Sequence, residues 1–173
     1  APSCVAPTAL TASNITSSSA DLSWTAGGTE TVWELTYGPQ GFNPGSGALV
    51  PMLAATSHGL SGLTDNTSYD YYVKADCGSG QLSTWAGPYT FTTLCDLINT
   101  FPYTMGFENG FNCWDQLDAD GGNSWGLISA QGIANSIAAG IQYNVSDHDD
   151  HLLSPPFSVA ANSSRLSFNA SDL

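Results

Sequence analysis

Apolar and polar residues alternate along four short segments in the first half of the chain. The segments are residues 21–24, 32–37, 69–76 and 88–93. In each, apolar or aromatic side chains stand two residues apart, which places them on one face of an extended strand. Turns rich in Gly, Pro and Asn separate the segments, and no helical periodicity interrupts them. About seven short strands at this spacing are typical of an antiparallel β-sandwich, so we predict an all-β fold.

The hydrophobic pattern changes from Cys95 onward. Longer loops rich in Gly, Asn and Asp separate isolated aromatic residues, and segments with strand character are fewer. We predict strands at residues 127–128, 137–143, 152–153 and 165–168. The change of pattern divides the chain into two predicted domains, residues 1–94 and residues 95–173.

Composition indicates a globular protein with an unusually acidic surface. Hydrophobic residues make up 42% of the sequence, which excludes a disordered tail, while only 10% of the residues are charged. Lys74 and Arg165 are the only strong bases against 15 carboxylates, so the formal net charge is -13. Nucleic acids and anionic membranes bind basic patches and repel such a surface. We therefore expect no nucleic-acid partner, and calcium is the natural counterion.

The cysteine content points to an oxidising compartment. Cys4, Cys77, Cys95 and Cys113 form an even set in a chain rich in Ser, Thr and Gly, which favours disulfides. No close pair of cysteines of the kind that binds zinc occurs. No apolar run approaches the ~18–20 residues that span a bilayer, so no membrane insertion is expected. We predict a secreted or cell-surface protein.

Residues 1–94 resemble a fibronectin type III domain. The resemblance rests on Pro7 and Leu10, on Trp24 in the second predicted strand, and on residues 63–69. The last segment is similar to the tyrosine corner of that family, in which a phenol near the start of strand F bonds back to upstream backbone. Residues 85–93 resemble the form common in large secreted bacterial proteins. The fold implied is a fibronectin III β-sandwich.

The same resemblance implies a disulfide pairing. In the family, the N-terminus and the F–G loop lie at one pole of the sandwich, while strand G leaves at the other. Cys4 is then expected to pair with Cys77, and Cys95 with Cys113. Four cysteines allow three connectivities, and the sequence alone leaves all three open.

Residues 95–173 resemble MAM domains and, more closely, the cleaved-adhesin modules of large bacterial surface proteases and haemagglutinins. The shared motifs are Phe107-Glu108, Cys113-Trp114, Trp125, residues 153–156 and residues 166–168, with residues 118–125 and 170–172 matching the adhesin version. The resemblance implies a jelly-roll-like β-sandwich, but such domains run roughly twice as long. We therefore expect a partial domain, completed by the rest of a larger chain or by a partner chain, because an unpaired central strand exposes backbone donors and acceptors.

Glu108, Asp118, Asp120 and Asp172 are the residues that we expect to bind calcium. Calcium takes six to eight hard oxygen ligands, which carboxylates and backbone carbonyls supply. The resemblance to calcium-bearing jelly rolls supports this set, with Glu108 foremost. Residues 118–121 are similar to part of an EF-hand loop but lack its downstream Glu, so an EF-hand is excluded. The alternative is that these Asp and Gly residues form an ordinary solvated turn.

No group of residues forms a recognisable catalytic centre. Glu108 and Asp118 could act as a glycosidase pair, but acidic pairs are common at this composition. No G-x-S-x-G or comparable nucleophile motif occurs. His148 and His151 lead into a predicted strand, where side chains three residues apart face opposite sides and do not easily chelate one ion. We read this histidine pair as part of a polar loop.

Four aromatic residues are candidates for stacking on sugar rings: Trp33, Tyr71, Tyr72 and Trp85. A β-sandwich also needs several aromatics in its core, and we favour packing in the core or on a strand face.

Together these observations predict a non-catalytic, calcium-stabilised adhesion or recognition module of a secreted or cell-surface multidomain bacterial protein. The expected ligands are glycans or host or matrix proteins. Two alternatives stay open. The chain could hold accessory modules of a secreted protease or polysaccharide hydrolase whose catalytic domain lies elsewhere, or it could be a cargo or structural component of a surface secretion machinery.

Overall fold

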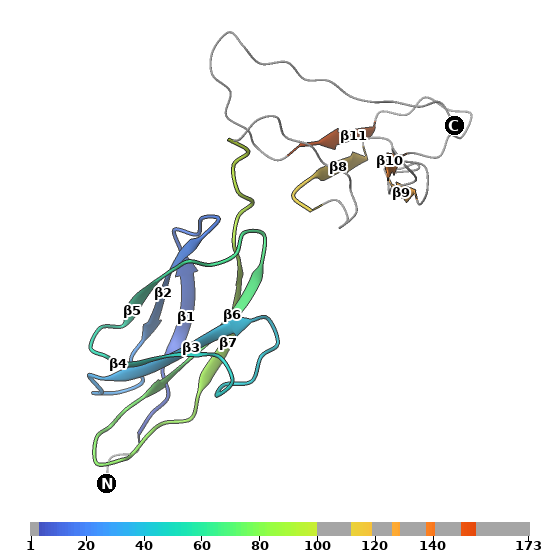
Figure 1. Ribbon diagram of the computed structural model, residues 1–173. Helices are drawn as coiled ribbons and strands as arrows, with labels where there is room; N and C mark the ends of the chain where they lie inside the picture. The colour runs from blue at the N-terminus through green and yellow to red at the C-terminus, as the bar shows by residue number, and fades with distance from the viewer. Residues whose placement is uncertain (1–3, 100–111, 119–125, 129–137, 141–149, 155–173) are drawn as a thin grey trace. The chain divides into compact units, whose positions relative to one another are not determined.

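A computed structural model describes residues 4–99, 112–118, 126–128, 138–140 and 150–154 (Figure 1). The chain divides into two compact units, Ala1–Cys95 and Asp96–Leu173. All regular elements in the described ranges are β-strands, which confirms the predicted all-β class. Among the same residues, no helix of a length and hydropathy suited to crossing a membrane occurs.

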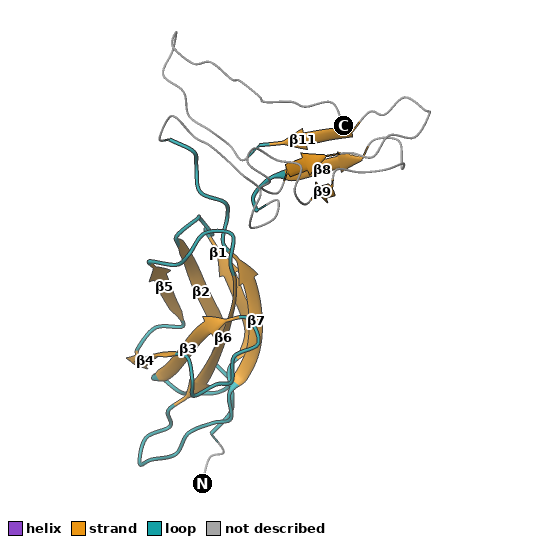
Figure 2. Cartoon of the chain, turned by 45° about the vertical axis from the view of Figure 1, so that its right-hand side comes forward, coloured by secondary structure: helices purple, strands orange, loops and turns teal. Residues whose placement is uncertain are grey.

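Seven strands form two antiparallel sheets in the first unit (Figures 1 and 2). The strands are β1 (Thr8–Ser13), β2 (Ser19–Thr25), β3 (Trp33–Pro39), β4 (Ala48–Leu53), β5 (Ser57–Ser61), β6 (Ser68–Ala75) and β7 (Ala86–Thr92). One sheet has the order β1-β2-β5 and the other the order β4-β3-β6-β7. The four segments predicted from alternation correspond to β2, β3, β6 and β7.

Strand β6 illustrates how the sequence selects the two faces of the larger sheet. Tyr71, Val73 and Ala75 are fully buried, whereas Tyr72 and Lys74 between them are partly exposed. This period of two turns alternate side chains toward the core and toward the outer face. Because β6 is paired on both sides, by β3 and by β7, it lies in the interior of the sheet.

Apolar residues from both sheets form one core between them. Its members are Ala20, Leu22, Trp24, Trp33, Leu35, Leu60, Leu63, Tyr71, Val73, Ala75 and Phe91. Trp24 and Trp33 meet edge to face, with ring centroids 6.2 Å apart. Removing each large apolar side chain from water contributes ~2–3 kcal/mol, which makes this core the main source of stability.

Tyr71 links the two sheets through the core. Its hydroxyl lies 2.8 Å from the Thr11 carbonyl on β1 and 3.0 Å from the Ser23 carbonyl on β2, and it donates to these oxygens. Burial raises the pKa of Tyr71 far above its ordinary value, and the bond to Thr11 opposes that rise in part. The phenol therefore stays protonated and remains a donor at any physiological pH.

The chain enters the first unit at one end of the sandwich, which we call the N-terminal pole, and leaves at the other, the exit pole. The N-terminal pole consists of residues 4–7 and the β2–β3, β4–β5 and β6–β7 loops. The exit pole consists of the β1–β2, β3–β4 and β5–β6 loops and residues 93–95. The antiparallel registers assign each loop to its pole.

Hydrogen bonds around Tyr69 and Thr93 close the exit pole. The Thr64 N–H donates to the Tyr69 hydroxyl at 3.0 Å, which confirms the phenol-to-backbone bond expected of a tyrosine corner. Thr93 is buried; its hydroxyl donates to the Thr64 carbonyl at 2.7 Å and accepts from the Thr67 N–H at 2.9 Å. The Leu94 N–H then bonds to the Thr16 carbonyl at 3.0 Å.

Strand β4 forms one edge of the larger sheet and is irregular. Leu53 pairs with Trp33 and Val50 with Leu35, so Pro51 and Met52 bulge out of the ladder. Met52 has a φ of 59°, which is uncommon for a residue with a side chain. Its side chain is 79% exposed.

The described part of the second unit contains two strand pairs. Strand β8 (Asp115–Asp118) pairs with β11 (Asp150–Leu153), and β9 (Gly126–Ile128) pairs with β10 (Ala138–Gly140). Three of the strands predicted here coincide with β9, β10 and β11, while the predicted strand at 165–168 lies outside the described residues. The jelly-roll-like fold of this unit stays a prediction.

Candidate functional site

Most of the predicted calcium ligands lie outside the described residues. This holds for Glu108, Asp120 and Asp172. Asp118 is the last residue of β8, and in the ladder it pairs with Asp150 of β11. In the described ranges no three His, Cys, Asp or Glu residues come together in a group that could hold a metal ion. The calcium site therefore stays a prediction.

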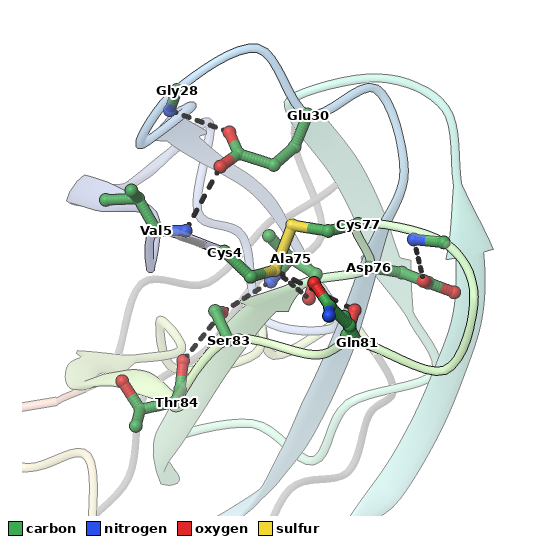
Figure 3. Close-up of a disulfide and its surroundings, with 11 residues drawn as sticks. Cys4, Val5, Gly28, Glu30, Ala75, Asp76, Cys77, Gln81, Ser83 and Thr84 are labelled. Carbon is green, nitrogen blue, oxygen red and sulfur yellow. Dashed lines mark hydrogen bonds between the residues drawn. A yellow bond between two sulfur atoms is a disulfide. The ribbon is translucent and has the colours of Figure 1, made fainter. Parts of the chain in front are cut away.

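A disulfide closes the N-terminal pole (Figure 3). Cys4, just ahead of β1, bonds to Cys77, just after β6. This is the pairing expected from the fibronectin-like arrangement of the two segments. Cys95 and Cys113 are disulfide-bonded as well, so none of the four cysteines, all of which the structure describes, is a free thiol.

Glu30 holds the entering chain against the β2–β3 loop. Its carboxylate accepts from the Val5 N–H at 3.2 Å and from the Gly28 N–H at 2.7 Å (Figure 3). Interaction with its own backbone N–H, followed by the bonds from Gly28 and Val5, lowers the pKa of Glu30 below its ordinary value. A side chain at Gly27 would overlap the Ala6 carbonyl, so a glycine is needed where the two segments touch.

The β6–β7 loop is a compact turn rather than an open loop. The Ser83 hydroxyl accepts from the Ala75 N–H and donates to the Thr84 carbonyl, both at 2.8 Å. The Cys77 N–H bonds to the Gln81 carbonyl at 2.9 Å, and the Ser83 N–H to the Ala75 carbonyl at 3.0 Å. Backbone and side-chain bonds therefore fix the position of the disulfide and of the residues that follow it.

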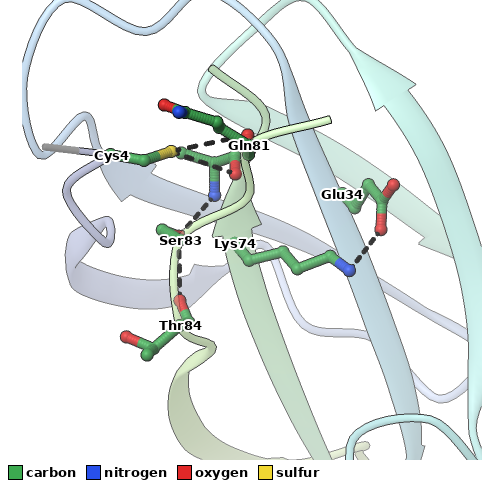
Figure 4. A network of polar contacts seen from close by, with 7 residues as sticks. Cys4, Glu34, Lys74, Gln81, Ser83 and Thr84 are labelled. Carbon is green, nitrogen blue, oxygen red and sulfur yellow. Dashed lines mark hydrogen bonds and ion pairs between the residues drawn. The ribbon is translucent and has the colours of Figure 1, made fainter. Parts of the chain in front are cut away.

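Lys74, Glu34 and Trp85 form a cluster on the outer face of the larger sheet. Figure 4 shows the Lys74–Glu34 pair of this cluster beside Ser83 and Thr84 of the β6–β7 loop. Glu34 and Lys74 are neighbours in the β3–β6 register, and their charged groups lie 2.8 Å apart. The Lys74 ammonium also lies 4.6 Å from the centre of the Trp85 ring. Both charged side chains are mostly buried, so the pair holds Trp85 in place.

A second cluster occupies the same outer face toward the exit pole. Asp70 is only 3% exposed, and its carboxylate accepts from the Thr90 hydroxyl at 2.5 Å and from the Gly41 N–H at 2.7 Å. The charge-assisted bond from Gly41 anchors the β3–β4 loop, while the bond from Thr90 connects Asp70 to β7. The loop places Phe42 edge-on to Tyr72, with ring centroids 5.4 Å apart.

The register joins the two clusters into one surface, which we call the outer face. Gly38 pairs with Asp70, Thr36 with Tyr72, and Glu34 with Lys74, so the clusters follow one another along β3 and β6. Gly87 of β7 approaches this row closely, because a side chain there would lie 2.7 Å from the Tyr71 carbonyl and 2.9 Å from the Tyr72 ring. Aromatic rings and fixed polar groups thus alternate across the outer face.

The structure separates the four predicted sugar-stacking candidates into two groups. Trp33 and Tyr71 are buried in the core, as favoured from the sequence. Tyr72 and Trp85 lie on the outer face and are partly exposed. Asp70 and Glu30 were not predicted from the sequence. Asp70 interrupts the aromatic run of β6, and that interruption is the one signal that could have identified it.

The comparison with protein families agrees with this fold. The family model of the fibronectin type III domain matches residues 5–92. Among solved structures, a computer-redesigned β-sandwich protein is 26% identical, with a TM-score of 0.45, and the match covers 51% of this chain and 94% of that one.

A myokine structure is 21% identical, with a TM-score of 0.45, over 53% of this chain and 99% of that chain. A structure of titin kinase and its flanking domains is also 21% identical, with a TM-score of 0.45, over 54% of this chain and 18% of that chain. None of the curated proteins matches. Because the family model covers half of the sequence, the chain belongs to the fibronectin type III family.

Proposed function

We propose that this chain is a non-catalytic adhesion or recognition module of a secreted or cell-surface multidomain bacterial protein. Fibronectin type III domains are generally structural or binding modules, and disulfides are typical of extracellular domains. The net charge of -13 favours a ligand other than nucleic acid or an anionic membrane. The ligand classes proposed are a glycan and a host or matrix protein.

The outer face is the observation that carries this proposal. Aromatic side chains are the residues that most often dominate binding energy, provided that their positions are fixed before the ligand arrives. Trp85 is held by Lys74 and Glu34, and Tyr72 by Phe42. The outer face therefore offers two partly exposed rings that lose little freedom on binding.

Binding of the full chain to a glycan array and to immobilised matrix proteins tests the proposal. Trp85→Ala and Tyr72→Ala should each weaken binding about tenfold or more. Thr11→Ala is the matched control, because its hydroxyl bonds to Ser23 on the other sheet and is exposed. Equal binding by all three variants would exclude the outer face.

We propose calcium as a stabilising ion of the second unit. The resemblance of residues 107–125 to calcium-bearing modules supports this, as does the position of Asp118 opposite Asp150 in the β8–β11 ladder. A chelator should lower the melting temperature of the second unit, and Asp118→Asn should reduce that sensitivity. An unchanged melting temperature in chelator would exclude the ion.

A further inference from the structure

The Cys4–Cys77 disulfide encloses almost the whole sandwich of the first unit. The two cysteines are 73 residues apart in the sequence, and strands β1 to β6 all lie between them. Between Cys77 and Cys95, only the β6–β7 loop and β7 remain outside the closed loop. A covalent path from the N-terminal pole to the exit pole therefore bypasses six of the seven strands.

From this connectivity we infer that the first unit transmits mechanical force along a chain under tension while its own length stays nearly fixed. Tension that arrives ahead of Cys4 passes through the disulfide to Cys77 and continues along residues 78–95. Strands β1 to β6 are not in series with the load and cannot be drawn out while the disulfide is intact. The inference rests on the proposed function in one respect, since tension requires attachments on both sides.

The segment that does carry the load is held in a resistant geometry. Cys77 follows β6 at the N-terminal pole, whereas Leu94 follows β7 at the exit pole. The β6–β7 ladder runs from Val73 opposite Ala86 to Ser68 opposite Thr92. Pulling Cys77 and Leu94 apart slides the two strands along each other, so the ladder bonds are loaded together and do not open one at a time.

Both ends of the loaded segment have little slack. At the N-terminal pole, the bonds of Ser83 to Ala75 and Thr84 keep the β6–β7 loop folded. At the exit pole, Thr93 and the bond from Leu94 to Thr16 hold the end of β7. The lifetime of a folded protein under force depends on its unfolding rate. These bonds lie in the segment that carries the load, so we expect them to slow its unfolding.

The same disulfide keeps the link continuous after a proteolytic cut. Lys74 is the only lysine of the sequence and lies inside the closed loop, while Arg165, the only arginine, belongs to the second unit. A cut after Lys74 leaves Cys4 and Cys77 joined. The two pieces of the first unit then remain one covalent chain.

Single-molecule extension of the full chain, with handles at both ends and no reductant, tests the inference. Opening of the first unit should release about 40 Å, because roughly 18 residues at ~3.6 Å each extend to ~65 Å and already span about 25 Å along β7 when folded. In Cys4→Ser/Cys77→Ser the release should grow by about 260 Å, the extended length of the enclosed segment. This variant should also open at a lower force at the same loading rate. Equal lengths or equal forces in the two proteins would overturn the inference.

Cys95→Ser/Cys113→Ser is the matched control, because it leaves Cys4–Cys77 in place and should keep the short release. This control also serves if Cys4→Ser/Cys77→Ser fails to fold, because it folds with the Cys4–Cys77 disulfide in place. Adding a phosphine reductant to it breaks only Cys4–Cys77, so the long release should appear on reduction. A short release that persists after reduction would overturn the inference.

A lysine-specific protease provides an independent measurement. Digestion in urea without reductant should leave one band of full mass, which separates into two on reduction. Two fragments without reductant would contradict the covalent bypass. None of these experiments uses a ligand, so failure of the recognition function would leave their outcome unchanged, and failure of the load path would leave glycan or protein binding unchanged.

Discussion

The two poles of the first unit are closed by different chemistry. At the N-terminal pole, the Cys4–Cys77 bond joins the entering chain to the end of β6. At the exit pole, hydrogen bonds to the Tyr69 and Thr93 hydroxyls hold the departing chain. A disulfide stabilises mainly by restricting the unfolded chain, whereas a buried hydrogen bond stabilises by satisfying groups that folding removes from water. The poles therefore respond to different perturbations.

The largest effect is expected from removal of the covalent closure. Cys4→Ser/Cys77→Ser should lower the free energy of unfolding of the first unit by about 4 kcal/mol, because the closed loop is long. Denaturant-dependent hydrogen exchange of the buried β6 amides measures this for the first unit alone. The Cys95→Ser/Cys113→Ser variant is the control. A loss below ~1 kcal/mol would contradict the larger contribution that we expect from the disulfide at the N-terminal pole.

At the exit pole, Thr93→Val should cost about 2 kcal/mol, because the Thr67 N–H and the Thr64 carbonyl lose a buried partner. The change keeps the shape of the side chain, so the loss reports on hydrogen bonding. Thr92→Val, at an exposed position, should change stability by less than ~0.5 kcal/mol. Chemical denaturation of the three proteins checks both values, and similar losses for the two variants would contradict the role of Thr93.

Tyr69→Phe should cost about 1 kcal/mol through loss of the acceptor for the Thr64 N–H. The ring stacks on Phe91, with centroids 5.8 Å apart, and the Phe variant keeps that contact. Hydrogen exchange of the Thr64 amide should accelerate more than that of the β6 amides. Uniform acceleration would mean that the phenol acts on the whole unit and not on the exit pole.

The smallest effect concerns Glu30 at the N-terminal pole and depends on pH. Its pKa is lower in the folded chain than its ordinary value of 4.5, so its bonds to Val5 and Gly28 stabilise above that pH. This stability is lost as the pH falls through the lowered pKa. Thermal melts of the wild type and Glu30→Gln should differ slightly at pH 7 and converge at low pH. A difference that persists at low pH would contradict the linkage.

The sequence identified strands where burial alternates and missed them where it does not. Segments β2, β3, β6 and β7 were predicted because apolar residues stand two apart in each. Strand β5 has only Leu60 in the core, and β4 contains Pro51, so neither shows a clear period of two. Strand β1 was also missed, since only Leu10 and Ala12 pack against the core.

The candidate site was predicted where side chains carry the signal. Cys4, Cys77 and Tyr69 followed from the family pattern, and Tyr72 and Trp85 from their aromatic character. Glu30 and Asp70 did not, because their partners include backbone N–H groups that folding brings from distant positions. Backbone donors leave no trace in residue identity, so such contacts require the structure.

The bulge in β4 has a consequence for behaviour at high concentration. A regular edge strand with exposed apolar residues would invite a second molecule to add a strand, and Leu49 and Met52 are 57% and 79% exposed. Pro51 has no N–H to offer such a strand, and the backbone of Met52 turns out of register. Crowded copies of this protein can therefore lie side by side without seeding aggregation through that edge.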